Sequence, residues 1–239
     1  MSAENGNEML RVEGLTAGYR GRTVVWGVDL HANRGEVVVL LGSNGAGKTT
    51  TLSTILGLVK PQSGTMTYDG DRWAGGKPWN AASKGMTMIS SERFTFGELS
   101  VRENLTLGGY SVPKSEIEPR MDAIFEQFPI LAERREQLAG TMSGGQQRML
   151  SLGMALMSEP KMLLLDEPSL GLAPTIVDQL METVRGLVDE RQMSVLMVEQ
   201  NVGQVLSIAD RAYVMRSGRI LLEESADEMR ARDQWWDLF

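Results

Sequence analysis

A glycine-rich stretch, GSNGAGKT at residues 42–49, constrains this 239-residue chain more than any other feature. It matches the pattern G-x-x-x-x-G-K-[ST]. It lies between a continuous apolar run at 37–41 and a segment whose apolar residues recur at helical spacing, namely Leu52, Ile55, Leu56 and Val59. A strand, a loop and a helix in this order surround phosphate with backbone N–H groups at the positive end of the helix. The stretch therefore predicts an α/β fold that binds a nucleoside triphosphate.

The residue types in the loop predict how it contacts the nucleotide. Lys48 supplies a positive charge for the β- and γ-phosphates, and the Thr49 hydroxyl is placed to ligate Mg²⁺. The expected nucleotide-binding residues here are Gly42, Ser43, Asn44, Gly45, Ala46, Gly47, Lys48, Thr49 and Thr50. The loop alone does not distinguish kinases, GTPases and motor ATPases.

A second apolar run, at 162–165, ends in two adjacent carboxylates, Asp166 and Glu167. In a phosphate-loop fold Asp166, at the carboxyl end of its strand, would hold Mg²⁺ through water. Glu167 would reach the attacking water as its general base or orient it. Taken alone, the pair could also be a solvated strand end, because acidic residues are common at the surface. Its combination with the phosphate loop favours the catalytic interpretation.

The segment TMSGGQQRML at 141–150 predicts another helix that begins at an anion-binding end. Ser143 is a good N-cap, so the helix is expected to begin near Gly144 or Gly145. MSGGQ resembles the LSGGQ signature of ATP-binding cassette (ABC) proteins, with Met142 in place of the usual Leu. The resemblance implies an α/β P-loop NTPase cassette with a RecA-like nucleotide-binding core, an N-terminal antiparallel β region and an inserted helical subdomain.

The resemblance also implies roles for particular residues. Two cassettes pack head to tail around two ATP molecules, and one cassette closes over the γ-phosphate of the other through Ser143, Gly144, Gly145 and Gln146. Tyr19 lies where the family places an aromatic residue that stacks on adenine, and ordinary packing is the alternative. The implied catalytic residues are Glu167, Lys48 and Gln200, and the implied Mg²⁺ ligands are Thr49 and Asp166.

Gln200 takes the place of a histidine that contacts the γ-phosphate in many cassettes. A carboxamide donates a hydrogen bond to phosphate as an imidazole does, but it takes up no proton near neutral pH. The resemblance therefore implies that Gln200 senses the γ-phosphate and that Glu167 carries the base chemistry. A plain strand end is the alternative for Gln200.

One loop departs from the common cassette pattern. Counting back from LSVRENL at 99–105, Ser91 occupies the position of the family's hinge glutamine, and Glu92 is the better chemical match. Phe94 and Phe96 follow, in the region that receives a helix of a membrane partner in this family. They either serve that purpose or belong to the core.

Two further segments, DEPSLGLAP and VEQN, narrow the resemblance. Ala173 replaces the Asp that usually ends the first motif. Together they resemble cassettes of the LivF type, which serve branched-chain (hydrophobic) amino acid uptake systems and their urea and amide relatives. Trp235 and Trp236 could pack as an amphipathic tail or rest against a partner.

No internal repeat or low-complexity linker divides the chain, so one domain over 1–239 is expected. Its expected parts are a core subdomain at about 1–89 and 157–239 and a helical subdomain at about 90–156. Pro174 is expected to begin a helix that runs to about Glu190, since Pro favours a first helical turn. Ser217 and Gly218 are expected to turn a β-hairpin.

Composition and charge restrict the cellular location and the partners that are expected for the chain. No apolar run approaches the roughly 20 residues of a membrane-spanning helix, and the N-terminal segment lacks the pattern of a secretory signal. The absence of cysteine excludes disulfide and thiol chemistry, and with a single histidine it excludes a His/Cys metal site. A net charge of −7 disfavours nucleic acid as a main partner.

The leading hypothesis is an ATPase subunit of an ABC importer, with ATP and Mg²⁺ as ligands, on the cytoplasmic face of the membrane. The resemblance implies transmembrane permease subunits, a second cassette and, indirectly, a periplasmic or extracellular solute-binding protein as partners. It implies a heterodimer of cassettes in the cell and leaves a homodimer open in isolation. One alternative is a soluble ABC ATPase of DNA repair or translation, although such chains usually carry a coiled-coil insertion or two linked cassettes. Another is a cassette that regulates without hydrolysis.

Overall fold

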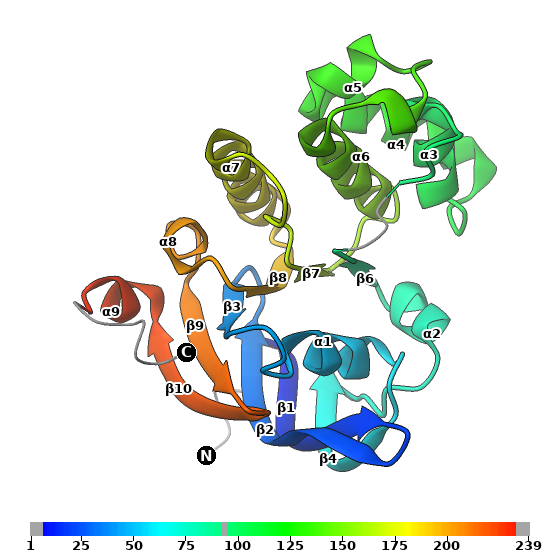
Figure 1. The fold of residues 1–239 in the computed structure, drawn as a ribbon. Helices are drawn as coiled ribbons and strands as arrows, with labels where there is room; N and C mark the ends of the chain where they lie inside the picture. Colours follow the sequence, from blue (N-terminus) through cyan, green and yellow to red (C-terminus); the bar gives the residue numbers. More distant parts are fainter. Residues whose placement is uncertain (1–6, 92–94, 233–239) are drawn as a thin grey trace.

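The antiparallel sheet lies at the N-terminal end of the chain in a computed structural model that describes residues 7–91 and 95–232 (Figure 1). Its strand order is β2-β1-β4-β5. The strands are β1 (Glu8–Tyr19), β2 (Arg22–Asn33), β4 (Pro61–Tyr68) and β5 (Asp71–Arg72). This sheet confirms the antiparallel β region that the sequence predicted.

A six-stranded sheet has the order β10-β9-β3-β8-β7-β6 and is parallel except for β10, which pairs antiparallel with β9. Its strands are β3 (Val37–Leu41), β6 (Met86–Ile89), β7 (Met162–Asp166), β8 (Ser194–Glu199), β9 (Arg211–Arg216) and β10 (Arg219–Ser225). The apolar runs at 37–41 and 162–165 are therefore strands, as expected. β8 lies between them, and the turn at Ser217 and Gly218 closes the predicted hairpin with φ of 49° and 79°.

The parallel strands are buried on both faces, because each face has its own core. Alternate residues of β3 divide between them: Val37, Val39 and Leu41 join one cluster, and Val38 and Leu40 join the other. The second cluster fills the space between the two sheets together with apolar residues of α1 (Lys48–Leu56). The phosphate loop therefore connects a fully buried strand to a helix that is buried along nearly all of its length.

The helices other than α1 lie around the six-stranded sheet or, from α3 to α6, form a group of their own (Figure 1). They are α2 (Pro78–Ser83), α3 (Val101–Gly108), α4 (Lys114–Gln127), α5 (Pro129–Glu133), η1 (Ala139–Thr141), α6 (Gly144–Leu156), α7 (Pro174–Arg191), α8 (Val202–Val205) and α9 (Ala226–Arg230). The predicted starts of α6 and α7 are confirmed. The expected helix after the phosphate loop is shorter than its apolar spacing suggested, because Gly57 ends it with φ of 92° and leaves Val59 outside.

Helices α3 to α6 follow β6 and precede β7, and Figure 1 shows them gathered away from the antiparallel sheet. Capping boxes begin α3 at Ser100 and α6 at Ser143, since each serine exchanges hydrogen bonds with the residue three positions later. The inserted helical region confirms the predicted fold class, and its proposed limits at residues 90 and 156 stay a prediction. None of the helices in the described part of the chain is long and apolar enough to cross a membrane.

Candidate active site

The phosphate loop connects β3 to α1 and surrounds a small pocket. The pocket has a volume of about 240 Å³ and is lined by Val24, Asn44, Gly45, Ala46, Gly47, Lys48, Thr49, Thr50 and Glu167. A Cβ at Gly42 would lie 2.5 Å from the Met215 carbonyl oxygen, so only glycine fits there. Gly47 has a φ of 110°, which L side chains rarely adopt. Both glycines allow the chain to turn tightly and to point the start of α1 into the pocket.

Lys48 is buried beneath this loop. Its Nζ donates hydrogen bonds to the carbonyl oxygens of Gly42 at 2.7 Å and Ser43 at 3.2 Å. The same Nζ lies 3.3 Å from Oε1 of Glu167. The ammonium group of Lys48 therefore contacts both the loop carbonyl groups and the carboxylate of Glu167. These contacts compensate the positive charge of Lys48, which is buried away from water.

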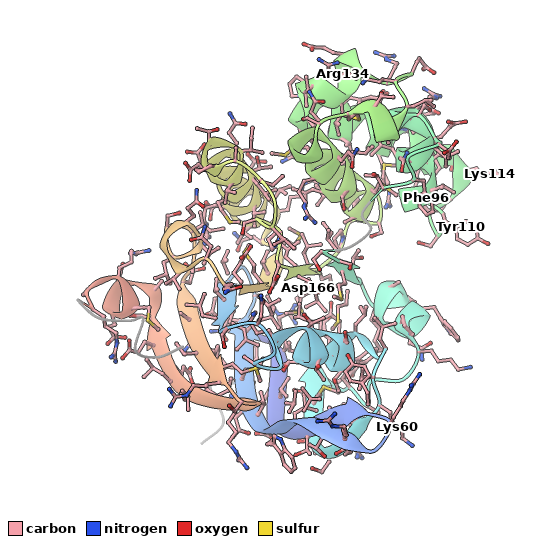
Figure 2. All side chains as sticks on the ribbon, viewed as in Figure 1. Lys60, Phe96, Tyr110, Lys114, Arg134 and Asp166 are labelled. Carbon is pink, nitrogen blue, oxygen red and sulfur yellow. The ribbon has the colours of Figure 1, made fainter. Side chains whose placement is uncertain are left out.

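The two adjacent carboxylates enter the site from the end of β7. Asp166 is only 3% exposed, and Figure 2 shows it in the middle of the molecule where β7 ends. Its Oδ1 accepts a hydrogen bond of 3.0 Å from Oγ1 of Thr49. Glu167 follows in the left-handed region with a φ of 45°, which turns its side chain toward Lys48. The structure thus brings together Lys48, Thr49, Asp166 and Glu167 from segments 117 or more residues apart in sequence.

The donor set near Thr49 and Asp166 is suited to Mg²⁺. Hydroxyl and carboxylate oxygens are hard ligands, and Mg²⁺ is usually bound by one or two carboxylates together with phosphates and water. Among the described residues, no three His, Cys, Asp or Glu side chains form a complete metal cage. The Thr49–Asp166 pair therefore fits a metal that completes its coordination with the nucleotide, where it would neutralise phosphate charge.

Gln200 and Tyr19 are both exposed, and each lies at the end of a strand. Gln200 follows β8 and is exposed, and its backbone N–H donates to Oε2 of Glu199 at 3.1 Å. Tyr19 ends β1 with 48% of its surface exposed. Neither belongs to the described residues that line the phosphate pocket. Their expected roles stay predictions, and an exposed Tyr19 is available to stack on a base.

The signature residues Ser143 to Gln146 occupy the start of α6, away from the phosphate pocket of the same chain. The Ser143 Oγ accepts from the Gln146 N–H at 3.4 Å, and the Ser143 N–H donates to the Gln146 side chain at 3.1 Å. Gly145 lies so close to α7 that an added Cβ would be 2.6 Å from Cγ2 of Ile176. Ser143, Gly145 and Gln146 border a second pocket of about 390 Å³ beside α7.

The loop before α3 is held by Asn104. This fully buried amide donates to the carbonyl oxygens of Phe96, Leu99 and Ser100 and accepts from the Phe96 N–H. Phe96 is 57% exposed, which excludes the core alternative for its ring (Figure 2). Ser91 is partly buried, and Glu92 and Phe94 lie outside the described residues, as do Trp235 and Trp236.

Sequence reasoning assigned no role to three buried polar residues, namely Asn104 on α3 and, nearer the catalytic carboxylates, Arg148 and Glu199. Arg148 of α6 donates to the Ser90 carbonyl oxygen at 3.2 Å. Burial lowers the pKa of its guanidinium, and the negative charges of Glu199 and Asp166 oppose that shift. The available signal was a charged residue inside an apolar pattern, as in RMLSL or LMVE.

A phosphate loop with a buried lysine, a hydroxyl and two carboxylates at the end of a parallel strand defines a P-loop nucleotide-binding protein. Comparison with known proteins narrows this class. A family model described as ABC transporter matches residues 25–170. The chain belongs to the ABC transporter ATP-binding family and is an ATP-hydrolysing enzyme of that class.

Individual relatives agree over nearly the whole chain. The protein is 43% identical over 217 residues to "High-affinity branched-chain amino acid transport ATP-binding protein BraG" of Pseudomonas aeruginosa, covering 91% of this chain and 93% of that one. It is 33% identical to "Probable branched-chain amino acid transport ATP-binding protein LivF" of Archaeoglobus fulgidus, over 95% of this chain and 96% of the relative. A "Lipopolysaccharide export system ATP-binding protein LptB" of Haemophilus influenzae is also 33% identical, over 95% and 94%.

A solved structure shows the same fold. It is the ADP conformation of an ATP-binding cassette of an ABC transporter, with a TM-score of 0.88, 25% sequence identity and coverage of 97% of this chain and 98% of that one. The predicted family, fold class and ATPase activity are therefore confirmed.

Proposed function

We propose that this chain is the ATPase subunit of an importer for branched-chain or other hydrophobic amino acids, or for urea or amides. The observation that carries the proposal is the 43% identity, over nearly the full length of both chains, to a protein named for high-affinity branched-chain amino acid transport. The 33% identity to a protein named for lipopolysaccharide export supports export as the second candidate. Solute selectivity resides in other chains of such systems.

In the proposed mechanism, Lys48 binds the β- and γ-phosphates, and Thr49 and Asp166 would hold Mg²⁺, which would neutralise phosphate charge. Glu167 accepts a proton from the water whose oxygen attacks the γ-phosphorus, as the bond from that phosphorus to the ADP oxygen breaks. Support comes from the 3.3 Å separation of Lys48 and Glu167 and the 3.0 Å hydrogen bond between Thr49 and Asp166. Gln200 reports the γ-phosphate, and Tyr19 stacks on adenine.

The proposed assembly contains a second cassette and transmembrane permease subunits, at the cytoplasmic face of the membrane. Because Ser143 to Gln146 are remote from the phosphate pocket of their own chain, they are free to close over a nucleotide on the second cassette. The exposed Phe96 is suited to contact a permease. A solute-binding protein takes part indirectly, and nucleic acid is not expected to bind.

Replacement of the general base tests the mechanism. Glu167→Gln keeps the shape of the side chain but removes the proton acceptor, so we expect ATP turnover to fall by at least about 100-fold while ATP still binds and holds a cassette dimer together. Turnover is measured by phosphate release and dimerisation by gel filtration with ATP. Wild-type turnover would show that Glu167 is not the base.

Replacement of the loop lysine tests the binding site. Lys48→Ala removes the phosphate charge and the hydrogen bonds to Gly42 and Ser43, so ATP binding should be lost in equilibrium titration. Lys60→Ala, at an exposed lysine, is the matched control and should bind ATP normally. Equal ATP affinity in both variants would contradict the proposed cradle.

Isolation of the intact complex from membranes tests the transport assignment. We expect permeases and a binding protein that binds a branched-chain amino acid, urea or an amide, as shown by mass spectrometry and solute titration. Recovery with lipopolysaccharide export components would favour the second candidate. Salt-sensitive recovery with DNA or ribosomes, without membrane proteins, would instead indicate a non-transport ATPase.

A further inference from the structure

Glu199 is a buried carboxylate in the centre of the parallel sheet, and the mechanism above does not use it. It ends β8 with 2% of its surface exposed. In the sheet register it pairs with Leu41, the last residue of β3 before the phosphate loop. Its neighbour Val198 pairs with Asp166 of β7. Glu199 therefore lies between the two strands that deliver the phosphate loop and the catalytic carboxylates.

One oxygen of Glu199 completes the hydrogen bonding of the turn that carries Glu167. In this turn the Glu167 N–H donates to the Val198 carbonyl oxygen at 3.0 Å, and the Leu170 N–H donates to the Glu167 carbonyl oxygen at 3.1 Å. Pro168 has no N–H. The remaining donor, the Ser169 N–H, binds Oε1 of Glu199 at 2.8 Å. Because Glu167 has a φ of 45°, its backbone is strained and depends on these bonds.

The other oxygen of Glu199 binds the backbone N–H of the residue that follows it in the chain. Its Oε2 accepts from the Gln200 N–H at 3.1 Å. A single carboxylate thus joins the turn after Glu167 to the backbone of Gln200. The positively charged guanidinium of Arg148 on α6 interacts with the negatively charged carboxylate of Glu199. This attraction offsets part of the free-energy cost of burying the carboxylate.

We propose that Glu199 is a positioning residue for ATP hydrolysis, which fixes the Glu167 turn and Gln200 relative to each other through its two carboxylate oxygens. The proposal rests on the role of Glu167 proposed above. A buried charge costs stability unless it is paired and hydrogen-bonded, and an apolar residue would fill the end of β8 without that cost. The position of Glu199 explains why a carboxylate is present there, because few other side chains accept hydrogen bonds from the Ser169 and Gln200 N–H groups at the same time.

The test replaces Glu199 by Gln in the full chain and, where turnover requires it, in the assembled complex. Gln keeps the size but directs an NH₂ group at one of the two N–H donors, so one bond is lost. We expect kcat to fall by about 10- to 100-fold, because a small displacement of a catalytic group has effects of this size. The dissociation constant for ATP should change by less than about twofold, since β3 and α1 carry the binding loop.

Glu36 offers a matched control at the other end of the sheet. It is also buried, accepts from the Asn33 N–H at 2.7 Å and the Arg211 Nε at 2.8 Å, and precedes β3. Glu36→Gln should lower the melting temperature without changing kcat. If Glu199→Gln also leaves kcat unchanged, its carboxylate is structural only and the proposal is overturned.

A measurement on the wild-type chain covers the case in which Glu199→Gln does not fold. Hydrogen exchange by NMR should show the Ser169 amide protected like amides of the sheet, and free exchange at Ser169 would overturn the proposal. Glu167→Gln is assayed in parallel. If Glu167→Gln hydrolyses ATP at the wild-type rate, both the assignment of Glu167 as the base and the positioning role of Glu199 are overturned. If Glu167→Gln is inactive and Glu199→Gln is fully active, only the positioning role of Glu199 is overturned.

Discussion

Tyr68 is a buried phenol in the core between the two sheets, where its ring packs against Trp73 at a centroid distance of 6.2 Å. Its hydroxyl has no hydrogen-bond partner among the described residues, and burial raises the pKa of the phenol. The nearby Trp73, in contrast, donates from its ring nitrogen to the Ile55 carbonyl oxygen at 2.7 Å. The two aromatic residues therefore share an environment but differ in how well their polar atoms are satisfied.

We expect Tyr68→Phe to leave the protein as stable as the wild type or to stabilise it by about 1 kcal/mol, because it removes an unsatisfied buried hydroxyl and keeps the ring. Chemical denaturation measures the change. Trp73→Phe is the comparison and should destabilise, because it leaves the Ile55 carbonyl oxygen without its donor. A clear loss of stability in Tyr68→Phe would show that its hydroxyl has a partner.

At the scale of elements, α6 and α7 are in close contact at Gly145. Gly145 lies in the first turn of α6, and glycine has a lower helix propensity than every residue except proline, so propensity does not account for it. The close approach of Ile176 explains why position 145 is a glycine, because an added Cβ would lie 2.6 Å from Cγ2 of Ile176. Packing between helices thus outweighs intrinsic helix propensity at this position.

A double-mutant cycle tests this contact. Gly145→Ala should lower the free energy of unfolding by about 1 to 3 kcal/mol through overpacking. In an Ile176→Ala background, which lacks the obstructing methyl, the same change should be neutral or stabilising. Additive effects in thermal or urea unfolding would contradict the contact.

The comparison of expected and observed elements shows what local sequence determines. Strands with continuous apolar runs, the serine cap of α6 and the proline at the start of α7 were all predictable, because each signal lies within a few neighbouring residues. The apolar spacing from Leu52 to Val59 does not show where α1 ends, because Gly57 stops the helix before Val59. The type of an element follows from a local sequence pattern, but the residue at which the element ends depends on the backbone conformation.

The residues of the site that belong to short motifs could be predicted from the sequence. The contacts between residues far apart in the sequence could not. Lys48, Thr49, Asp166 and Glu167 were expected together, and the structure places them in contact. The hydrogen bond from Ser169 to Glu199 joins residues 30 positions apart, and no short pattern specifies it. Such bonds depend on strand order, which local periodicity does not reveal.

At the scale of the whole molecule, Asp69 connects the two sheets. It lies at the end of β4 and accepts from Lys161, just before β7, at 2.6 Å, and from Arg34, just after β2. These hydrogen bonds from Lys161 and Arg34 lower the pKa of Asp69 from its ordinary value of 3.8. The lowered pKa means that the ionised form binds these partners in the folded state.

Asp69→Asn should therefore reduce the free energy of unfolding by about 1 kcal/mol or less at pH 7, since exposed lysine and arginine partners are screened by solvent. The difference from wild type should be present above the pKa of unfolded Asp and disappear as pH falls through the lower pKa of the folded state. Asn also tolerates the φ of 53° at this position, so backbone strain is unchanged. Urea unfolding at pH 7 and pH 3 measures the difference.

Asp71→Asn is the control, because the Asp71 side chain is 71% exposed and, within the described ranges, forms an ion pair with Lys84 alone, at 2.8 Å. It should change stability less than Asp69→Asn at pH 7. A difference that persists undiminished at pH 3 would show that Asp69 does not act through its charge.

The strand order also determines how this molecule behaves at high concentration. The six-stranded sheet ends on one side at β10, where exposed and partly exposed residues alternate and Arg219, Glu223 and Glu224 carry charge. On the other side it ends at β6, which has only 4 residues. Charged or short edge strands discourage the addition of further strands from other molecules. The sheet that carries the catalytic groups is thus protected against edge-to-edge aggregation, while the fully buried strands β3, β7 and β8 lie inside.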